Sequence, residues 1–134
     1  QMCIRDSYSG YNSPAGEDLN GRDQAHAPSY QYSFSATFGG VSDWFGDIVI
    51  QGQDGFYFSD THDFQSDAHA LINAGLGRYI GDFEAHFWIK NLFDQEYSVR
   101  GFFFGNDPRT GYADTGWTQM GNPRQFGISI RKDF

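Results

Sequence analysis

The chain has 134 residues, enough for one domain or for part of a larger one. Its net charge of -8 argues against a nucleic-acid partner, which calls for a basic surface. The single Cys cannot form an internal disulfide, and the absence of any run of about 18 apolar residues excludes a transmembrane helix. Abundant Gly and an aromatic content of 19% favour an all-β protein over a helical one.

Residues 1–7 are expected to be extraneous to the fold. They hold the single Cys and one of the two Met residues, and no alternation joins them to the segment that follows. They lack the basic region followed by an apolar region that marks a secretory signal. Because the string resembles a translated sequencing-adapter remnant, we expect the true N-terminus to lie further upstream.

Five later segments alternate between apolar and polar residues, which predicts amphipathic β-strands. The segments are residues 29–38, 44–58, 68–79, 83 to about 99, and 125–134. Short turns are expected at 39–43 and 80–82. Longer connections are expected at 59–67 and at a loop of some twenty residues from about Arg100 to Asn122.

The alternation of short and long connections is typical of a bacterial outer-membrane barrel, which has tight periplasmic turns and long outer loops. Such strands present apolar residues to lipid and polar residues to the lumen. On this reading residues 8–28 are an outer loop, and residues 29–134 are barrel strands with their loops. Gly81 would then lie in a periplasmic turn, Gly111 in an outer loop, and Phe134 at the periplasmic end of the last strand.

The stretch Asn91-Leu92-Phe93-Asp94-Gln95-Glu96-Tyr97 resembles the N-L-F-D-x-x-Y signature near the C-terminus of TonB-dependent outer-membrane receptors. In that family the signature lies on the penultimate strand, before a long loop, a Pro-Arg pair and a last strand that ends in Phe. Pro123-Arg124 and Phe134 occupy those places here. Ala27-Pro28 is also similar to the family's Ala-Pro pair before a strand. Lys132 departs from the family, which usually has an apolar or aromatic residue there.

The resemblance implies an antiparallel transmembrane β-barrel, of which this chain would be about the last five of twenty-two strands. Five strands alone cannot close a barrel, since the smallest barrels have about eight. The implied function is active uptake of a scarce ligand, with an iron–siderophore favoured over haem, cobalamin or a glycan. No enzymatic activity and no cofactor are implied.

Four kinds of partner follow from the resemblance. They are outer-membrane lipid, the plug domain of the same full-length chain, the barrel-assembly machinery, and the TonB complex. The TonB complex would act through an N-terminal region that is missing here, because residues 1–134 contain neither a plug nor a TonB box. The location would be the bacterial outer membrane.

The predicted ligand contacts lie in the outer loop before the last strand. Loop aromatics often bind ligands, and Arg suits anionic groups. The predicted residues are Phe102, Phe103, Phe104, Arg109, Tyr112 and Trp117, with Arg100 in the same loop. The alternative is that Phe102 to Phe104 continue a strand and lie at the outer interface.

Other predicted roles belong to the barrel wall. The residues expected to face the lumen or the plug are Glu84, His86, Trp88 and Lys90, with generic wall polarity as the alternative. The residues expected to form the assembly signal of the terminal strand are Phe126, Ile128, Ile130 and Phe134. Trp44, Phe83 and Phe134 are expected at the membrane interfaces.

No catalytic or metal-binding residues are predicted. The acidic cluster of Asp60, His62, Asp63 and Asp67 lacks the converging ligands on a rigid element that a metal site needs. Two alternatives to the receptor remain. One is a secreted β-sandwich that binds carbohydrate through Trp117 and Tyr112, and the other is an ungated porin-type barrel.

Overall fold

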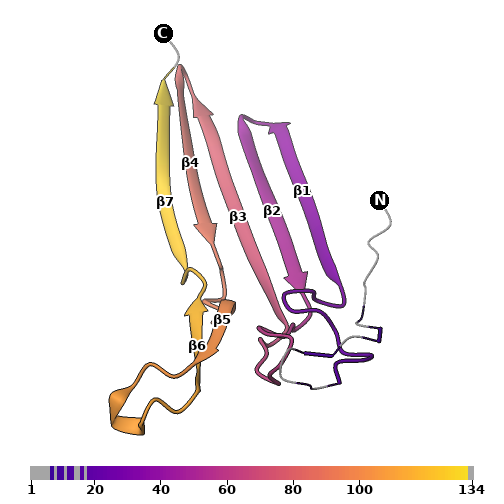
Figure 1. Cartoon of the computed structure of the whole chain (residues 1–134). Helices are drawn as coiled ribbons and strands as arrows, with labels where there is room; N and C mark the ends of the chain where they lie inside the picture. Colours follow the sequence, from indigo (N-terminus) through magenta and orange to yellow (C-terminus); the bar gives the residue numbers. More distant parts are fainter. Residues whose placement is uncertain (1–6, 8, 11, 14–15, 17, 133–134) are drawn as a thin grey trace. The chain divides into compact units, whose positions relative to one another are not determined.

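The computed structural model describes residues 7, 9–10, 12–13, 16 and 18–132. The chain divides into two compact units (Figure 1). The loop unit comprises residues 1–30, 53–68 and 97–121, and the sheet unit comprises residues 31–52, 69–96 and 122–134. The described part contains no helix long and apolar enough to cross a membrane.

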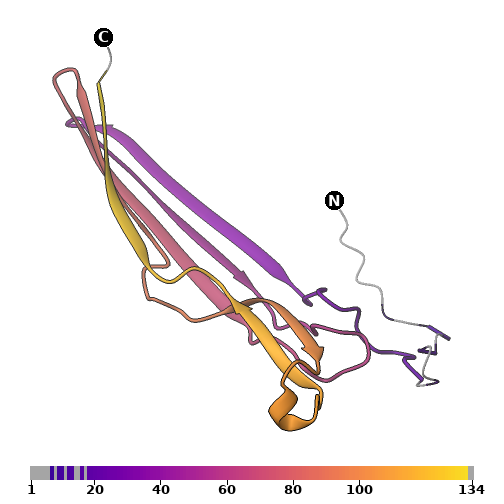
Figure 2. The same ribbon diagram turned by 60° about the vertical axis from the view of Figure 1, so that its left-hand side comes forward.

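The sheet unit is built on one antiparallel sheet of five strands. In spatial order these are β1 (Gln31–Val41), β2 (Trp44–Gln53), β3 (His69–Ile80), β4 (Phe83–Lys90) and β7 (Gln125–Lys132). The strands run side by side in both ribbon views (Figures 1 and 2). The predicted all-β, antiparallel fold is confirmed. The sheet ends at β1 and β7, so the described strands do not close into a barrel.

Two tight turns connect the hairpins of this sheet, at the positions that the sequence predicts. Between β1 and β2, Ser42 and Asp43 both have positive φ, 54° and 64°. Two such residues in a row are typical of a type I′ turn, whose twist matches that of the flanking strands. Between β3 and β4, Gly81 has a φ of 59°, which glycine adopts without steric cost.

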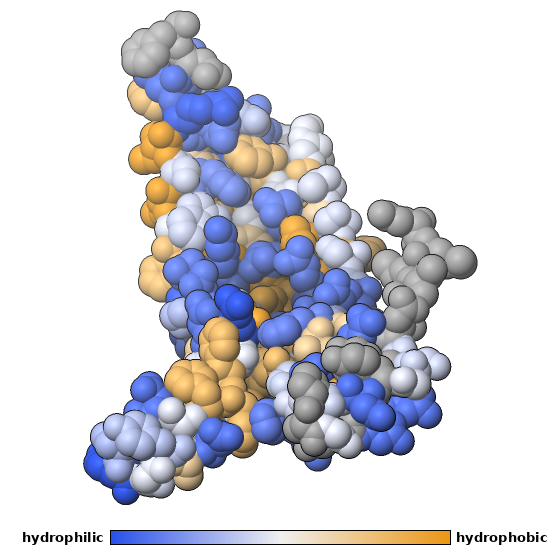
Figure 3. All heavy atoms as spheres, in the orientation of Figure 1, coloured by the Kyte–Doolittle hydropathy of each residue, from blue (hydrophilic) through white to orange (hydrophobic). Residues whose placement is uncertain are grey.

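The register gives the sheet one apolar and one polar face. Leu76 lies opposite Phe87, and Phe87 lies opposite Ile128, so their side chains point to the same side. Many of the large side chains of this apolar face are 38–72% exposed, and they are Tyr32, Phe34, Phe38, Trp44, Ile48, Leu76, Ile80, Phe83, Phe87, Phe126, Ile128 and Ile130. Figure 3 shows hydrophilic residues over much of the opposite, polar face and hydrophobic residues along the edge at β7.

Two predicted strand ends are wrong. The second strand ends at Gln53 instead of residue 58, because Phe56 and Phe58 are buried in the loop unit, at 7% and 6% exposure. The fourth strand ends at Lys90 instead of continuing toward Val99. There the left-handed conformation of Asn91, with a φ of 51°, breaks the extended backbone.

The predicted loop from Arg100 to Asn122 is also corrected. It contains most of a second antiparallel sheet, formed by β5 (Ser98–Phe104) and β6 (Thr115–Met120). A short 3₁₀ turn, η1 (Pro108–Thr110), lies in the connection between these strands. The loop unit therefore carries a β-hairpin in place of an irregular connection.

The buried hydrophobic side chains of the described residues all belong to the loop unit. They are Leu19, Phe56 and Phe58. The described residues of the sheet unit contribute none, so neither face of the five-stranded sheet encloses a hydrophobic core.

Candidate ligand face and its supports

One side of the β5–β6 hairpin carries an exposed row of aromatic rings with an arginine at its end. We call this the aromatic face and define it as Arg100, Phe102, Phe104 and Trp117. Phe102 pairs with Trp117 across the hairpin, and the three aromatic side chains are each 44% exposed. Because β-strand side chains alternate, Arg100, Phe102 and Phe104 share one side.

The rings of the aromatic face contact one another in sequence. The ring centroids of Phe102 and Phe104 are 6.4 Å apart, and those of Phe104 and Trp117 are 6.5 Å apart. The guanidinium carbon of Arg100 lies 4.9 Å from the centre of the Phe102 ring. The face thus offers flat apolar surfaces beside one cation, which suits a ligand with both a ring system and an anionic group.

The other side of the hairpin packs inside the loop unit. The Phe103 ring lies 4.1 Å from the ring of His62 and 6.3 Å from that of Phe64. Gly101 lies beneath Phe58, so closely that a Cβ at this position would come within 2.3 Å of the ring. Phe103 therefore points away from the aromatic face. Phe102 to Phe104 all lie in β5, as the alternative in the sequence analysis expected, so strand alternation separates Phe103 from Phe102 and Phe104.

An arginine that the sequence analysis did not single out organises the segment beneath the hairpin. The Arg22 guanidinium lies 4.6 Å from the centre of the Tyr57 ring and donates from Nη1 to Asp63 Oδ1 at 2.9 Å. Its Nη2 also donates to the backbone carbonyl of His62. A lone Arg in a polar stretch gives no periodic signal by which sequence reasoning could have found it.

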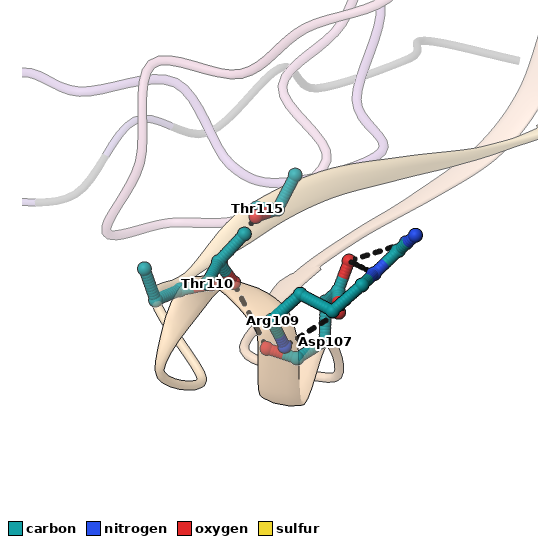
Figure 4. A network of polar contacts seen from close by, with 5 residues as sticks. Asp107, Arg109, Thr110 and Thr115 are labelled. Carbon is teal, nitrogen blue, oxygen red and sulfur yellow. Dashed lines mark hydrogen bonds and ion pairs between the residues drawn. The ribbon is translucent and has the colours of Figure 1, made fainter.

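Arg109 lies in the hairpin connection, bound to Asp107 (Figure 4). Its backbone N–H donates to Asp107 Oδ1 at 2.9 Å, and its Nη2 donates to Asp107 Oδ2 at 2.8 Å. Thr110 Oγ1 donates to the Asp107 carbonyl at 2.9 Å, and the turn ends at Gly111 with a φ of 67°. Tyr112, 65% exposed, lies in the same connection. Neither Arg109 nor Tyr112 belongs to the aromatic face as defined above.

The Asp107–Arg109 pair shifts the titration of both groups. The side-chain hydrogen bonds from Arg109, and then its backbone N–H, hold the pKa of the Asp107 carboxyl below its usual value. The same pair raises the pKa of the Arg109 guanidinium. Since the pKa of Asp107 is lowered, the pair stabilises this connection above the carboxyl's ordinary pKa, and that contribution is lost as the pH falls through the lowered value.

The four residues that we expected to face the lumen lie on the polar face of β4. They are Glu84, His86, Trp88 and Lys90. Arg131 Nη2 lies 3.5 Å from Glu84 Oε2, and Asp47 Oδ1 lies 3.8 Å from His86 Nε2. The Trp88 ring covers Gly127, where a Cβ would come within 2.6 Å of it. The polar face therefore holds the Glu84–Arg131 ion pair together with the Trp88 ring.

The terminal strand presents its predicted apolar residues to the apolar face. Phe126, Ile128 and Ile130 are 68%, 71% and 72% exposed. They lie opposite Ile89, Phe87 and Ala85 of β4. Phe134 lies outside the described residues.

Asn91, the first residue of the signature, is a buried polar residue of the sheet unit that makes several hydrogen bonds. It is only 4% exposed. Its Nδ2 donates to the carbonyls of Gln95 at 2.9 Å and Asn122 at 3.2 Å, while its Oδ1 accepts from Gln95 N at 2.9 Å. Its backbone N–H donates to Asn73 Oδ1 at 2.9 Å. One side chain thus ties the end of β4 to the segment before β7.

Asp94 and Tyr97, two other members of the signature, also make specific contacts. Asp94 Oδ1 accepts from the backbone N–H of Arg124 at 2.7 Å in the sheet unit. Within the loop unit, the Tyr97 ring covers Gly121, and the Tyr97 carbonyl accepts from Gly121 N at 2.8 Å. Asn91, Asp94 and Tyr97 of the signature therefore each make a contact within the unit to which they belong.

The described residues contain no group of three or more His, Cys, Asp or Glu side chains arranged to hold a metal ion. No protein-family model matches the sequence, and no solved structure matches the fold.

Proposed function

We propose that this chain is the C-terminal part of a TonB-dependent receptor barrel in a bacterial outer membrane. The observation that carries the proposal is the apolar face, which is exposed across all five strands of the sheet. Exposure of apolar surface to water costs about 25 cal/mol per Å². Contact with lipid would remove that cost, and the polar face would then line the water-filled lumen of the barrel.

Strand length supports a lipid environment. The five strands have 11, 10, 12, 8 and 8 residues in spatial order. A tilted strand needs about 9–11 residues to cross a bilayer, so their lengths centre on that range. In the alternative β-sandwich, a second sheet would cover the apolar face. None of the described large hydrophobic residues of this face is buried.

The open edges of the sheet support a larger barrel. In lipid, the backbone groups at the outer edges of β1 and β7 would need hydrogen-bond partners, so strands from the remainder of the full-length chain would pair with these edges. The plug domain of that chain would contact the polar face at Glu84, His86, Trp88 and Lys90. The barrel-assembly machinery would recognise the terminal strand β7.

The aromatic face is the proposed ligand contact of this segment. Phe102, Phe104 and Trp117 would stack on a ligand ring, and Arg100 would bind its anionic group. Such surfaces suit an iron–siderophore, with haem, cobalamin and glycans as alternatives. The TonB complex would act on the plug through the N-terminal region, and this segment would perform no chemistry.

Cysteine labelling of the full-length protein in intact cells tests the proposed orientation. Gly81, Gly111 and Tyr112 have positive φ, so a cysteine is better placed at Asp82 in the tight turn and at Ala113 in the hairpin connection. In a background without other cysteines, we expect an impermeant maleimide to label Ala113→Cys and to leave Asp82→Cys unlabelled until the cells are lysed. The reverse pattern would overturn the topology. Labelling of both sites in a secreted protein would favour the β-sandwich.

A further inference from the structure

We propose that Arg22 is a positioning residue of the aromatic face, because it holds the segment that supports the β5–β6 hairpin from the opposite side. The inference rests on the proposed function, since it takes the aromatic face as a ligand contact. It goes beyond that function because Arg22 lies in a different segment of the chain. Residues 8–28, 59–67 and most of 100–122, which we expected to be separate outer loops, all belong to the loop unit.

A tight turn fixes the backbone of Arg22. The Arg22 N–H donates to the Leu19 carbonyl at 3.1 Å, and Leu19 is only 4% exposed. Gly21, within this turn, has a φ of 79°, which glycine adopts without steric cost. The Arg22 side chain therefore projects from an anchored backbone, and it is itself only 21% exposed.

The guanidinium of Arg22 makes three contacts with one neighbouring segment. Its Nη1 donates to Asp63 Oδ1 at 2.9 Å, and its Nη2 donates to the carbonyl of His62. Its central carbon lies 4.6 Å from the centre of the Tyr57 ring. A planar guanidinium can bond two acceptors and stack on a ring at once, whereas the ammonium of a lysine lacks both the fork and the flat surface.

The segment that Arg22 contacts is a hairpin-like loop, residues 56–66, whose two arms are bonded to each other. Phe58 N donates to the Phe64 carbonyl at 3.0 Å, and Ser66 N donates to the Phe56 carbonyl at 2.9 Å. The rings of Phe58 and Phe64 lie 5.1 Å apart. Backbone hydrogen bonds thus hold the arms of this loop, and Arg22 holds the part near its tip.

This loop supports both strands of the β5–β6 hairpin. On β5, the Phe103 ring lies 4.1 Å from the His62 ring. On β6, a Cβ at Gly116 would come within 2.7 Å of the Phe64 ring, and Gly116 pairs with Phe103 in the register. His62 connects the two ends of the path, because Arg22 binds its carbonyl and Phe103 contacts its ring.

Support of Phe103 fixes the backbone from which the aromatic face projects. Phe103 lies between Phe102 and Phe104 in β5, and the rings of these two neighbours are each 44% exposed. The position of such exposed rings depends on the backbone that carries them. With the backbone held, a ligand meets rings that are already in place, and binding avoids the cost of ordering a mobile segment.

Probe binding to the full-length protein in detergent tests the inference. The probe is para-trifluoromethylbenzoate, which carries an aromatic ring and a carboxylate, and fluorine NMR measures its binding against empty micelles. We expect Arg22→Gln to weaken probe binding about fivefold. Arg22→Lys keeps the positive charge beside Asp63 and should weaken binding less.

The matched control is Arg78→Gln, which makes the same change at an arginine of the sheet unit. The guanidinium carbon of Arg78 also lies over a ring, 5.3 Å from the centre of Trp44. We expect this variant to bind the probe like the wild type. An equal loss in Arg22→Gln and Arg78→Gln would show a general effect of charge and overturn the inference.

A double-mutant cycle tests whether Arg22 acts through Phe103. In the Phe103→Ala background this support is already lost, so Arg22→Gln should weaken binding little further. Additive losses overturn the inference. Where Arg22→Gln does not give the heat-modifiable band of a folded barrel, Asp63→Asn replaces it. This change removes the acceptor of Nη1 at a side chain that is 89% exposed, and it should also weaken binding.

Arg100→Gln separates failure of the inference from failure of the ligand contact. Weaker binding in Arg100→Gln together with unchanged binding in Arg22→Gln, or in Asp63→Asn where it is used, overturns the inference and leaves the aromatic face standing. An Arg100→Gln variant that binds like the wild type contradicts the aromatic face as a ligand contact, and the inference with it. A wild type that does not bind the probe above the micelle background contradicts both as well.

Discussion

At the scale of single residues, the Asn91 side chain connects the end of β4 to Gln95 and Asn122. Its side chain satisfies three backbone groups in a site where only 4% of the residue is exposed. Its φ of 51° belongs to the left-handed region, which Asn tolerates better than most residues. The hydrogen bonds of the side-chain amide and the left-handed backbone therefore both favour Asn at this position.

Two substitutions at Asn91 separate those contributions. Asn91→Gly keeps the backbone conformation and removes the side-chain hydrogen bonds, so we expect the free energy of unfolding to fall by about 1–3 kcal/mol. Asn91→Ala also removes the hydrogen bonds but keeps a Cβ in the left-handed region, which should cost about 1–2 kcal/mol more than glycine there. Denaturant titration of the full chain folded in detergent measures both values. Equal values for the two variants would show that the backbone conformation contributes nothing.

At the scale of elements, the hairpin β5–β6 shows what strand alternation predicts and where it fails. Residues 100, 102 and 104 follow the period of two that predicts a strand. The period is hard to see in the sequence because residues 102–104 are all Phe. Phe103 packs inside the loop unit, whereas Phe102 and Phe104 are exposed. Gly101 gave no sequence signal for its role, because the need for a glycine arises from the Phe58 ring above it.

Substitution of Gly101 tests the packing of the hairpin. Valine at this position would force the Phe58 ring to move, and we expect the free energy of unfolding to fall by about 1–3 kcal/mol. Gln119→Val is the control, because Gln119 is exposed and pairs with Arg100 in the same hairpin. Denaturation of both variants is followed by tryptophan fluorescence. A Gly101→Val variant as stable as the control would contradict the packing.

At the scale of the whole molecule, the five-stranded sheet was predictable and the loop unit was not. The sheet follows from short-range alternation and two turn signals, both of which are visible in the sequence. The loop unit depends on contacts between distant segments, such as Arg22 with Asp63 and Gly101 with Phe58. For the candidate site, the alternation of residues 100, 102 and 104 is visible in the sequence, whereas the pairing of Phe102 with Trp117 required the register.

The central claim is that one face of the sheet lies against lipid and the other against water. Nitroxide labels introduced singly on the terminal strand of the full-length protein in membranes test it most directly. Oxygen partitions into lipid, whereas a nickel chelate remains in water. We predict that oxygen relaxes labels at Phe126, Ile128 and Ile130 more strongly, and that the chelate does so at Gln125 and Ser129. Equal access of the chelate to both sets would contradict the account.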